Sequence, residues 1–223
     1  MIAKQNCKML FFCRAPVLGQ VKKRLAADVG EHEALRIYQQ LMAHNLKLAG
    51  EVDFADVDVV TTDTRHSYFE SLKKQGIKVF MQQGDGLGQR LVHAFKQAFE
   101  THQSAVLLGV DTFDMTLAHL QKSVNALQYS DAVITPVEDG GYILIGLSQH
   151  QPEVFRDIDW GTDQVFEQTC QRFAQFNLSY EILPKLRDID VLADLKHRPG
   201  NDSDDKLKSC PHTGMPGHRS GCR

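Results

Sequence analysis

Apolar runs recur along the chain and alternate with longer segments whose apolar residues follow a helical period. A run without internal periodicity is typical of a strand that is buried on both faces of a parallel sheet. The clearest example, Ala105–Leu108, is followed by Gly109 and then by two aspartates. Runs of this kind predict strands at residues 8–14, 56–62, 77–82, 105–108, 131–137, 143–147 and 180–183.

The segments between these runs predict helices. Residues 31–49 place Leu35, Leu41 and Leu46 on one face, which is the pattern of a helix that packs on a core. We expect the remaining helices from Val21 onward and at residues 66–75, 87–100, 117–127 and 163–176.

The order of these elements indicates the fold. Strands and helices alternate as far as residue 82, which favours a parallel sheet with right-handed crossovers. The strands at 131–137 and 143–147 follow one another directly, so we expect a mixed sheet. The sequence therefore predicts a single-domain α/β fold, with a central, mostly parallel mixed sheet flanked by helices.

Composition and charge narrow the possible functions. The chain has 223 residues, which suits one domain with a substantial core. Its net charge of −3 provides no basic excess for binding nucleic acid. No apolar segment approaches the length of a membrane span, and the apolar run at 9–13 is too short for a signal peptide. The five cysteines lack a CxxC spacing and fit a reducing compartment, so we expect a cytoplasmic protein.

The end of the chain differs in composition from the rest. Residues 196–223 contain no aromatic residue and almost no aliphatic one. Such a segment cannot bury enough apolar area to offset the entropy of ordering it. We therefore expect a disordered tail after a domain that spans residues 1–195.

Two aspartates, Asp111 and Asp114, follow the buried run at 105–108. In open α/β sheets, ligands bind outside the carboxyl ends of the strands, where Asp111 is expected to lie. A carboxylate there can hold Mg²⁺ or Mn²⁺ against a diphosphate, because these ions prefer oxygen ligands. The alternative is that Asp111 caps the next helix and that Asp114 is solvated.

A basic cluster follows the first predicted strand. The loop after this strand contains Pro16 and Gly19, and Lys22, Lys23 and Arg24 then stand at the start of a helix. Cations at a helix N-terminus oppose the macrodipole, so an anionic partner such as a diphosphate would explain their placement. The alternative is a solvated basic helix end, and in both cases we expect the two lysines to be exposed.

Two glycine-rich segments and the single tryptophan are further candidates. Residues 83–88, QGDGLG, predict either a loop that closely approaches a nucleotide or a tight turn before a helix. Asp139, Gly140 and Gly141 predict a hairpin bend or a place where a ligand lies against the backbone. Trp160 is either a buried anchor or a platform for a sugar ring or base.

Several of these segments occur together in one bacterial family. The segments are FCRAPVLGQVKKRLA, QQGDGLGQRLVHAF, LLGVDTFDM, PVEDGGYILIGL and LRDIDVLADL. On these segments the chain resembles the nucleotide-diphospho-sugar transferase-like proteins, which include arsenosugar-biosynthesis and selenodomain-associated glycosyltransferases. The resemblance covers about residues 8–195. It implies a GT-A-type, Rossmann-like fold related to the guanylyltransferases of molybdenum cofactor and phospholactate.

The resemblance, together with the position of Trp160, implies three groups of site residues. The candidates for nucleotide and phosphate binding are Arg14, Pro16, Gly19, Lys22, Arg24, Asp85, Gly88 and Arg90. The candidates for sugar or acceptor binding are Asp139, Gly140, Gly141 and Trp160, and the candidate metal ligands are Asp111, Asp190 and Asp188. Asp139 is also the candidate catalytic base, on its position alone.

The chain departs from the family pattern in two places. Phe113 replaces a proline, and Val-Leu-Ala at residues 191–193 replaces Thr-Pro-Glu. The lost proline removes a rigid turn after Asp111, and the second change affects the approach of the last acidic pair.

The expected function is metal-dependent glycosyl transfer from a nucleotide diphosphate sugar to a small-molecule acceptor, with Mg²⁺ or Mn²⁺ as the cofactor. One alternative is nucleotidyl transfer, in which the N-terminal loop holds a triphosphate and a phosphorylated acceptor attacks it. Another alternative is a nucleotide-binding module without catalysis.

Overall fold

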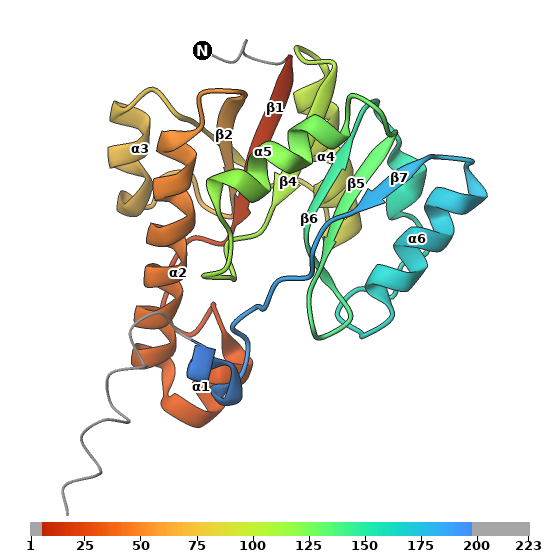
Figure 1. Cartoon of the computed structure of the whole chain (residues 1–223). Helices are drawn as coiled ribbons and strands as arrows, with labels where there is room; N and C mark the ends of the chain where they lie inside the picture. Colours follow the sequence, from red (N-terminus) through yellow and green to blue (C-terminus); the bar gives the residue numbers. More distant parts are fainter. Residues whose placement is uncertain (1–5, 198–223) are drawn as a thin grey trace, which may run out of the picture.

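The computed structural model describes residues 6–197, in which one sheet lies between two layers of helices (Figure 1). The sheet has seven strands in the order β3-β2-β1-β4-β6-β5-β7 within the described residues. The strands are β1 (Cys7–Cys13), β2 (Asp56–Thr61), β3 (Lys78–Met81), β4 (Ser104–Leu108), β5 (Ala132–Pro136), β6 (Tyr142–Leu147) and β7 (Tyr180–Ile182).

Helices connect most of these strands. The α-helices are α1 (Lys23–Val29), α2 (Glu31–Glu51), α3 (Glu70–Lys74), α4 (Leu87–Phe99), α5 (Leu117–Ala126) and α6 (Val165–Gln175). The short 3₁₀ helices are η1 (Ser67–Phe69), η2 (Pro152–Phe155) and η3 (Leu192–His197). None of the helices in the described part of the chain is long and apolar enough to cross a membrane.

The sheet is mixed, as the direct succession of two strands predicts. β1 pairs in parallel with β2 on one side and with β4 on the other. β6 is antiparallel to both of its neighbours, β4 and β5, because β5 and β6 form a hairpin. The predicted mixed α/β fold is therefore confirmed.

The two faces of the sheet are covered by different helices. Alternate residues of β1 point to opposite faces, so Phe11 lies in one core with α2, α3 and α5, while Leu10 lies in another core with α4 and α6. Phe95 of α4 and Phe173 of α6 are fully buried in the second core. This double coverage explains why the central strands β1 and β4 are mostly apolar, and the buried Lys8 of β1 is paired with Asp58 of β2.

Some boundaries differ from the predicted ones. The segment predicted as one helix at 66–75 is a 3₁₀ turn followed by a five-residue α-helix. The first helix begins at Lys23, because Lys22 adopts a left-handed conformation with φ 46°. Most of the predicted tail at 196–223 lies outside the described residues.

The carboxyl ends of β1 and β4 lie side by side at one edge of the sheet. Phe11 pairs with Leu108 in the parallel ladder between these strands. The residues that follow the two strands, Arg14 on one and Asp111 on the other, therefore emerge at the same edge, where open α/β sheets bind ligands.

The tip of the β5–β6 hairpin packs closely on the segment that leads into α6. Gly140 has φ +86°, and a Cβ atom built on it would lie 2.1 Å from the backbone oxygen of Asp163. The backbone oxygen of Gly140 also accepts a hydrogen bond of 2.9 Å from the backbone N–H of Phe166. Only glycine allows this approach without displacing the backbone.

Replacing Gly140 with alanine should lower the free energy of unfolding by more than about 1 kcal/mol, because a side chain meets both an unfavourable φ and a backbone clash. Urea denaturation measures this change. A matched control is Gly50→Ala near the end of α2, where the added Cβ has nothing within 4 Å. The control should be neutral or raise stability by up to about 1 kcal/mol, through its higher helix propensity. Equal effects of the two substitutions would contradict the packing assigned to Gly140.

Candidate functional site

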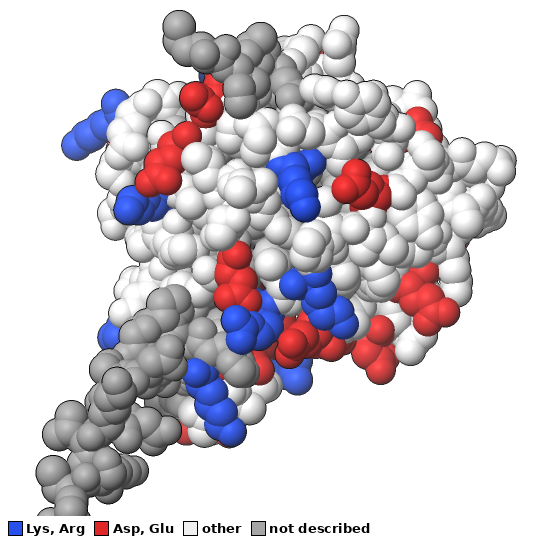
Figure 2. Space-filling model, in the orientation of Figure 1, with Lys and Arg blue, Asp and Glu red and all other residues white. Residues whose placement is uncertain are grey.

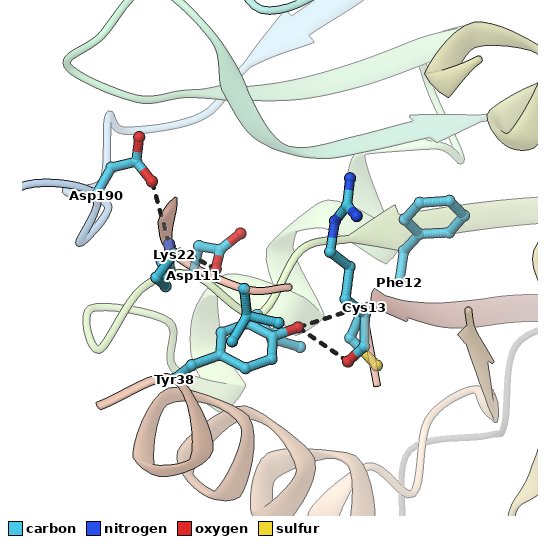
Figure 3. A pocket seen from close by; sticks show the side chains of 9 residues that line it. Phe12, Cys13, Lys22, Tyr38, Asp111 and Asp190 are labelled. Atoms are coloured by element: carbon cyan, nitrogen blue, oxygen red, sulfur yellow. Dashed lines mark hydrogen bonds and ion pairs between the residues drawn. The ribbon is translucent and has the colours of Figure 1, made fainter. Parts of the chain in front are cut away.

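The ammonium group of Lys22 lies at the centre of the candidate site (Figure 3). Its Nζ atom is 2.7 Å from Oδ1 of Asp111 and 3.5 Å from Oδ1 of Asp190. Both carboxylates point toward the lysine, although they come from segments far apart in the sequence. The Lys22 side chain is only 5% exposed, so the expectation of an exposed lysine is wrong. Lys23, the next residue, is exposed as expected.

The backbone and the charge state of Lys22 both reflect this position. The left-handed conformation, φ 46° and ψ 49°, is uncommon for a residue with a side chain and recurs at functional sites. Burial lowers the pKa of the Lys22 ammonium, but the charge and hydrogen bond of Asp111, with the charges of Asp190 and Asp188, outweigh burial and raise the pKa above its ordinary value. Lys22 is therefore a permanent, buried cation.

The loop that carries Asp111 is fixed by a buried asparagine of α2. The Asn45 side-chain amide donates hydrogen bonds to the backbone oxygens of Val110 at 3.2 Å and Thr112 at 2.8 Å. These residues flank Asp111, whose own backbone oxygen accepts a hydrogen bond of 2.9 Å from the N–H of Ile189. Hydrogen bonds therefore hold the loop from two sides. The Asp111 side chain itself is 42% exposed.

The C-terminal segment delivers the other acidic residues. Ile189 is buried in a small core with Leu25 of α1 and Ile37 of α2. This anchor keeps Asp188 and Asp190, its two neighbours, at the site. Asp190 accepts a hydrogen bond of 2.9 Å from the guanidinium of Arg24.

Asp188 lies in a strongly acidic environment. Burial and the charge of Asp139 raise the pKa of Asp188 to about 6, despite the opposing charge of Lys22. The carboxylates at the site outnumber its cations: Asp111, Asp139, Asp188 and Asp190 stand against Arg14, Lys22 and Arg24. Figure 2 shows acidic and basic side chains gathered beside one another in the lower middle of the face, while much of the surface above is uncharged.

The two segments that depart from the family pattern are each held by local contacts. The Phe113 ring packs edge-on against His44, with 5.8 Å between the ring centroids, and joins the small core around Ile189. After Asp190, the chain turns because Oδ2 of Asp194 accepts hydrogen bonds of 2.8 Å from the backbone N–H groups of Asp190 and Val191. The site geometry is thus held without the proline residues.

Asp114, the second aspartate of the β4 motif, has a structural contact. Its carboxylate accepts a hydrogen bond of 2.9 Å from the Arg187 guanidinium, so it is not simply solvated. The hydroxyl of Thr112 donates to the backbone oxygen of Arg187. Together these bonds attach the C-terminal segment to the loop that follows β4.

A small cleft of about 210 Å³ lies at the end of β1. Tyr38 of α2 closes its floor: the tyrosine hydroxyl accepts a 2.9 Å hydrogen bond from the backbone N–H of Arg14 and donates a 3.1 Å bond to the backbone oxygen of Arg14. The cleft is lined by Phe12, Cys13, Arg14, Val21, Lys22, Tyr38, Val110, Asp111 and Asp190.

A larger cleft of about 730 Å³ adjoins the small one and shares Phe12, Asp111 and Asp190 with it. Of the predicted acceptor residues, Asp139, Gly141 and Trp160 line this cleft, as does Arg24. Asp139 follows β5 at the hairpin tip, where Oδ1 accepts a 2.9 Å hydrogen bond from the backbone N–H of Gly141. Gly140 serves the hairpin packing described above.

The QGDGLG loop reaches the site less directly than predicted. The side chain of Arg90 donates to the backbone oxygen of Gly84 at 3.0 Å, and the N–H of Asp85 donates to the side chain of Gln89 at 3.0 Å, so both stabilise the loop itself. A Cβ on Gly88 would lie 2.8 Å from Nε1 of Trp160. Gly88 therefore permits α4 to pack against the tryptophan.

Pro16 and Gly19, the remaining loop candidates, shape the chain between β1 and Lys22. Pro16 is buried, and Gly19 has φ +71°, with the Glu31 carboxylate 3.1 Å from the position of a Cβ. Neither lines the two clefts.

The acidic residues of the site supply part of the ligand set of a divalent cation. Asp111 and Asp190 offer carboxylate oxygens, the ligand type that Mg²⁺ and Mn²⁺ prefer. Among residues 6–197, however, no three histidine, cysteine, aspartate or glutamate side chains form a group that could hold a metal ion. The donor set therefore fits a cation that takes further ligands from phosphate and water, which is how Mg²⁺ commonly binds.

The sequence pattern does not single out two residues of the site. They are Tyr38, which lines the small cleft, and Asn45, which fixes the loop of Asp111. Asn45 is fully buried beside Leu41 and Leu46 of the same face. A single amide within an apolar helix face is the signal that could have identified it, because a buried amide needs hydrogen-bond partners.

The structure is that of a Rossmann-like α/β protein with two adjoining clefts at the carboxyl edge of its sheet. The chain belongs to the family described as an uncharacterised protein conserved in bacteria, DUF2064, whose profile matches residues 45–162. Among curated proteins, no sequence matches this chain.

Solved structures agree with this assignment. A candidate nucleotide-diphospho-sugar transferase from Desulfovibrio desulfuricans G20 is 31% identical, with a TM-score of 0.80 over 92% of this chain and 91% of that protein. The predicted resemblance to nucleotide-diphospho-sugar transferase-like proteins is therefore confirmed.

Two more distant structures share the fold. The 4-diphosphocytidyl-2C-methyl-D-erythritol synthase of Anaerococcus prevotii DSM 20548 is 10% identical, with a TM-score of 0.57 over 86% and 94% of the chains. Rv0371c of Mycobacterium tuberculosis H37Rv, in complex with manganese, is 11% identical, with a TM-score of 0.52 over 86% and 96%.

Proposed function

We propose that this protein is a transferase that binds a nucleotide diphosphate sugar with a divalent cation and moves the glycosyl group to a small acceptor. The observation that carries the proposal is the buried ammonium of Lys22, held between Asp111 and Asp190 where two clefts meet. The 31% identical structure, a candidate nucleotide-diphospho-sugar transferase, supports the same class of substrate.

The small cleft suits the diphosphate of the donor. Arg14 and Lys22 line this cleft, and Arg24 lines the adjoining one. The carboxylates that line the two clefts, together with Asp188, still exceed these three cations, so a diphosphate would meet net repulsion. Two like charges about 4 Å apart repel by roughly 4 kcal/mol at an effective dielectric near 20.

An additional cation resolves this conflict of charge. Asp111 and Asp190 are the residues that would hold it, with Asp188 beside them, and its charge would stabilise the leaving diphosphate. That one of the structures sharing the fold is a manganese complex is consistent with this role.

The remaining steps are assigned to residues of the large cleft. The acceptor hydroxyl attacks the anomeric carbon of the donor, and the bond from that carbon to the diphosphate breaks. Asp139 takes the proton of the hydroxyl, because its carboxylate lines the large cleft together with Asp111 and Asp190. The backbone of Gly141 faces the same space and leaves room for a sugar ring.

Nucleotidyl transfer is the second candidate. It is favoured by the Anaerococcus protein of the same fold, which is named 4-diphosphocytidyl-2C-methyl-D-erythritol synthase. The two reactions release different products. Glycosyl transfer releases a nucleoside diphosphate from a nucleotide sugar, whereas nucleotidyl transfer releases diphosphate from a triphosphate.

A product assay therefore tests the proposed reaction. Incubation with Mn²⁺ and a panel of nucleotide sugars should release nucleoside diphosphate, and incubation with the four common nucleoside triphosphates should release no diphosphate. Release from triphosphates only, together with a phosphorylated acceptor, would support the second candidate. Binding of nucleotide sugars without any release would identify a non-catalytic binding module.

Lys22 and Lys23 provide a test of phosphate binding. We expect Lys22→Ala to weaken binding of a nucleoside diphosphate by at least about tenfold, because a charge-assisted contact contributes about 1.5–3 kcal/mol. Lys23→Ala removes the same charge from an exposed neighbour and should stay within about 0.5 kcal/mol of the parent. Isothermal titration calorimetry compares the two. Equal losses would indicate a diffuse electrostatic patch, which contradicts the assigned role of Lys22.

Asp111 provides a separate test of the cation. Asp111→Asn should reduce Mn²⁺-dependent binding of a nucleotide sugar, because a neutral amide oxygen is a weaker ligand for a divalent ion than a carboxylate. The matched control is Asp28→Asn, which removes the same charge from an exposed position of α1. Calorimetry with and without Mn²⁺ separates the effects. If both variants bind the nucleotide sugar as tightly as the parent in Mn²⁺, the metal role of Asp111 is wrong.

A further inference from the structure

The large cleft is lined by two chemically different groups of side chains. The apolar group includes Leu87, Leu91, Val165 and the ring of Trp160. The acidic group consists of Asp111, Asp139, Asp163 and Asp190. Arg24 is the one basic residue in the lining.

The apolar lining residues are grouped around Trp160. The edge of Trp160 packs against Gly88, where a Cβ would lie 2.8 Å from Nε1, and against Tyr142, with 6.4 Å between ring centroids. Leu87 stands next to this pair and is 43% exposed, although it begins a helix whose other apolar residues are mostly buried. A leucine and an indole that face open space together form a surface suited to an apolar ligand group.

The acidic group is not balanced by cations within the large cleft. Arg24 is already bonded to Asp190 at 2.9 Å, and Lys22 to Asp111 at 2.7 Å. Within residues 6–197, neither Asp139 nor Asp163 forms an ion pair; each carboxylate accepts a hydrogen bond from a neighbouring amide instead. A carboxylate or phosphate on the acceptor would therefore be repelled, whereas a hydroxyl or ammonium group would be attracted.

We propose that the acceptor is an alcohol that carries an apolar, ring-sized group and no negative charge. Its apolar group lies on Trp160 and Leu87, and its hydroxyl points toward Asp139. This assignment rests on the proposed function and adds to it the chemical class of the acceptor. In the reaction, the acceptor oxygen forms a bond to the anomeric carbon, the diphosphate leaves with the electron pair of the bond that breaks, and the hydroxyl proton passes to Asp139.

Binding of small probes tests the proposal without nucleotide, metal or turnover. The probes are benzyl alcohol, benzylamine and benzoate, which share one ring and differ in charge, and glucose, which lacks an apolar ring. Trp160 is the only tryptophan of the chain, so its fluorescence reports binding in this cleft directly.

We expect benzyl alcohol and benzylamine to change the emission of Trp160 in a saturable manner. Benzoate should bind at least about tenfold more weakly, and glucose should have no effect at the same concentrations. Leu87→Ser should weaken binding of benzyl alcohol. The control Ile182→Ser, at an aliphatic residue of β7 that is 51% exposed and outside the cleft, should leave it unchanged.

The charge assignment has its own variant. Asp139→Asn combined with Asp163→Asn should lower the ratio of the benzoate Kd to the benzyl alcohol Kd, because two negative charges are removed from the cleft. Benzoate binding as tightly as benzyl alcohol to the parent protein, a response to glucose alone, or no response to any probe would each overturn the proposal. Probe binding as expected, with no glycosyl transfer in the product assay, would instead reject the proposed function while leaving the cleft assignment intact.

Discussion

The ion pair between Lys22 and Asp111 joins the parts of this site. It connects the loop after β1 to the loop after β4, and the same ammonium also attracts Asp190 of the C-terminal segment. A buried ammonium without partners would be strongly unfavourable, so the three segments must meet for Lys22 to remain charged. The left-handed backbone of Lys22 aims the side chain at this point. Local strain, burial and charge pairing are therefore coupled at one residue.

Sheet topology makes that meeting possible. Because β1 and β4 are parallel neighbours, both strands release their loops at the same edge. β6 enters antiparallel beside β4, so the tip of its hairpin with β5 lies at this edge and brings Asp139 to the lining of the large cleft. The Gly140 contact with Asp163 then fixes the hairpin against the segment that carries Trp160. The antiparallel strand β6 thus allows the β5–β6 hairpin to contribute residues to the lining of the large cleft.

The excess of carboxylates links donor and acceptor recognition. Lys22 and Arg24 face more negative charge than they neutralise, and burial together with the charge of Asp139 raises the pKa of Asp188. The same imbalance favours a cation wherever phosphates bind and disfavours an anionic acceptor in the adjoining cleft. The small cleft is lined mainly by charged and polar groups, whereas the large cleft also has apolar side chains. We therefore assign the diphosphate of the donor to the small cleft and the acceptor to the large one.

The sequence by itself determined the order, type and approximate bounds of the elements, because apolar periodicity reports local burial on a strand or helix. It also brought forward Asp111 from its place after a buried strand and Asp139 from its place beside two glycines, and the resemblance to a family added Asp190. It could not reveal that Lys22 is buried or that Asn45 holds the Asp111 loop, because both depend on contacts between distant segments. Neither could it show that Arg90 stabilises its own loop, nor that Leu87 and Trp160 share a cleft with the carboxylates. Only the tertiary structure decides which charges meet, because a side chain's environment is set by elements that pack together from remote parts of the chain.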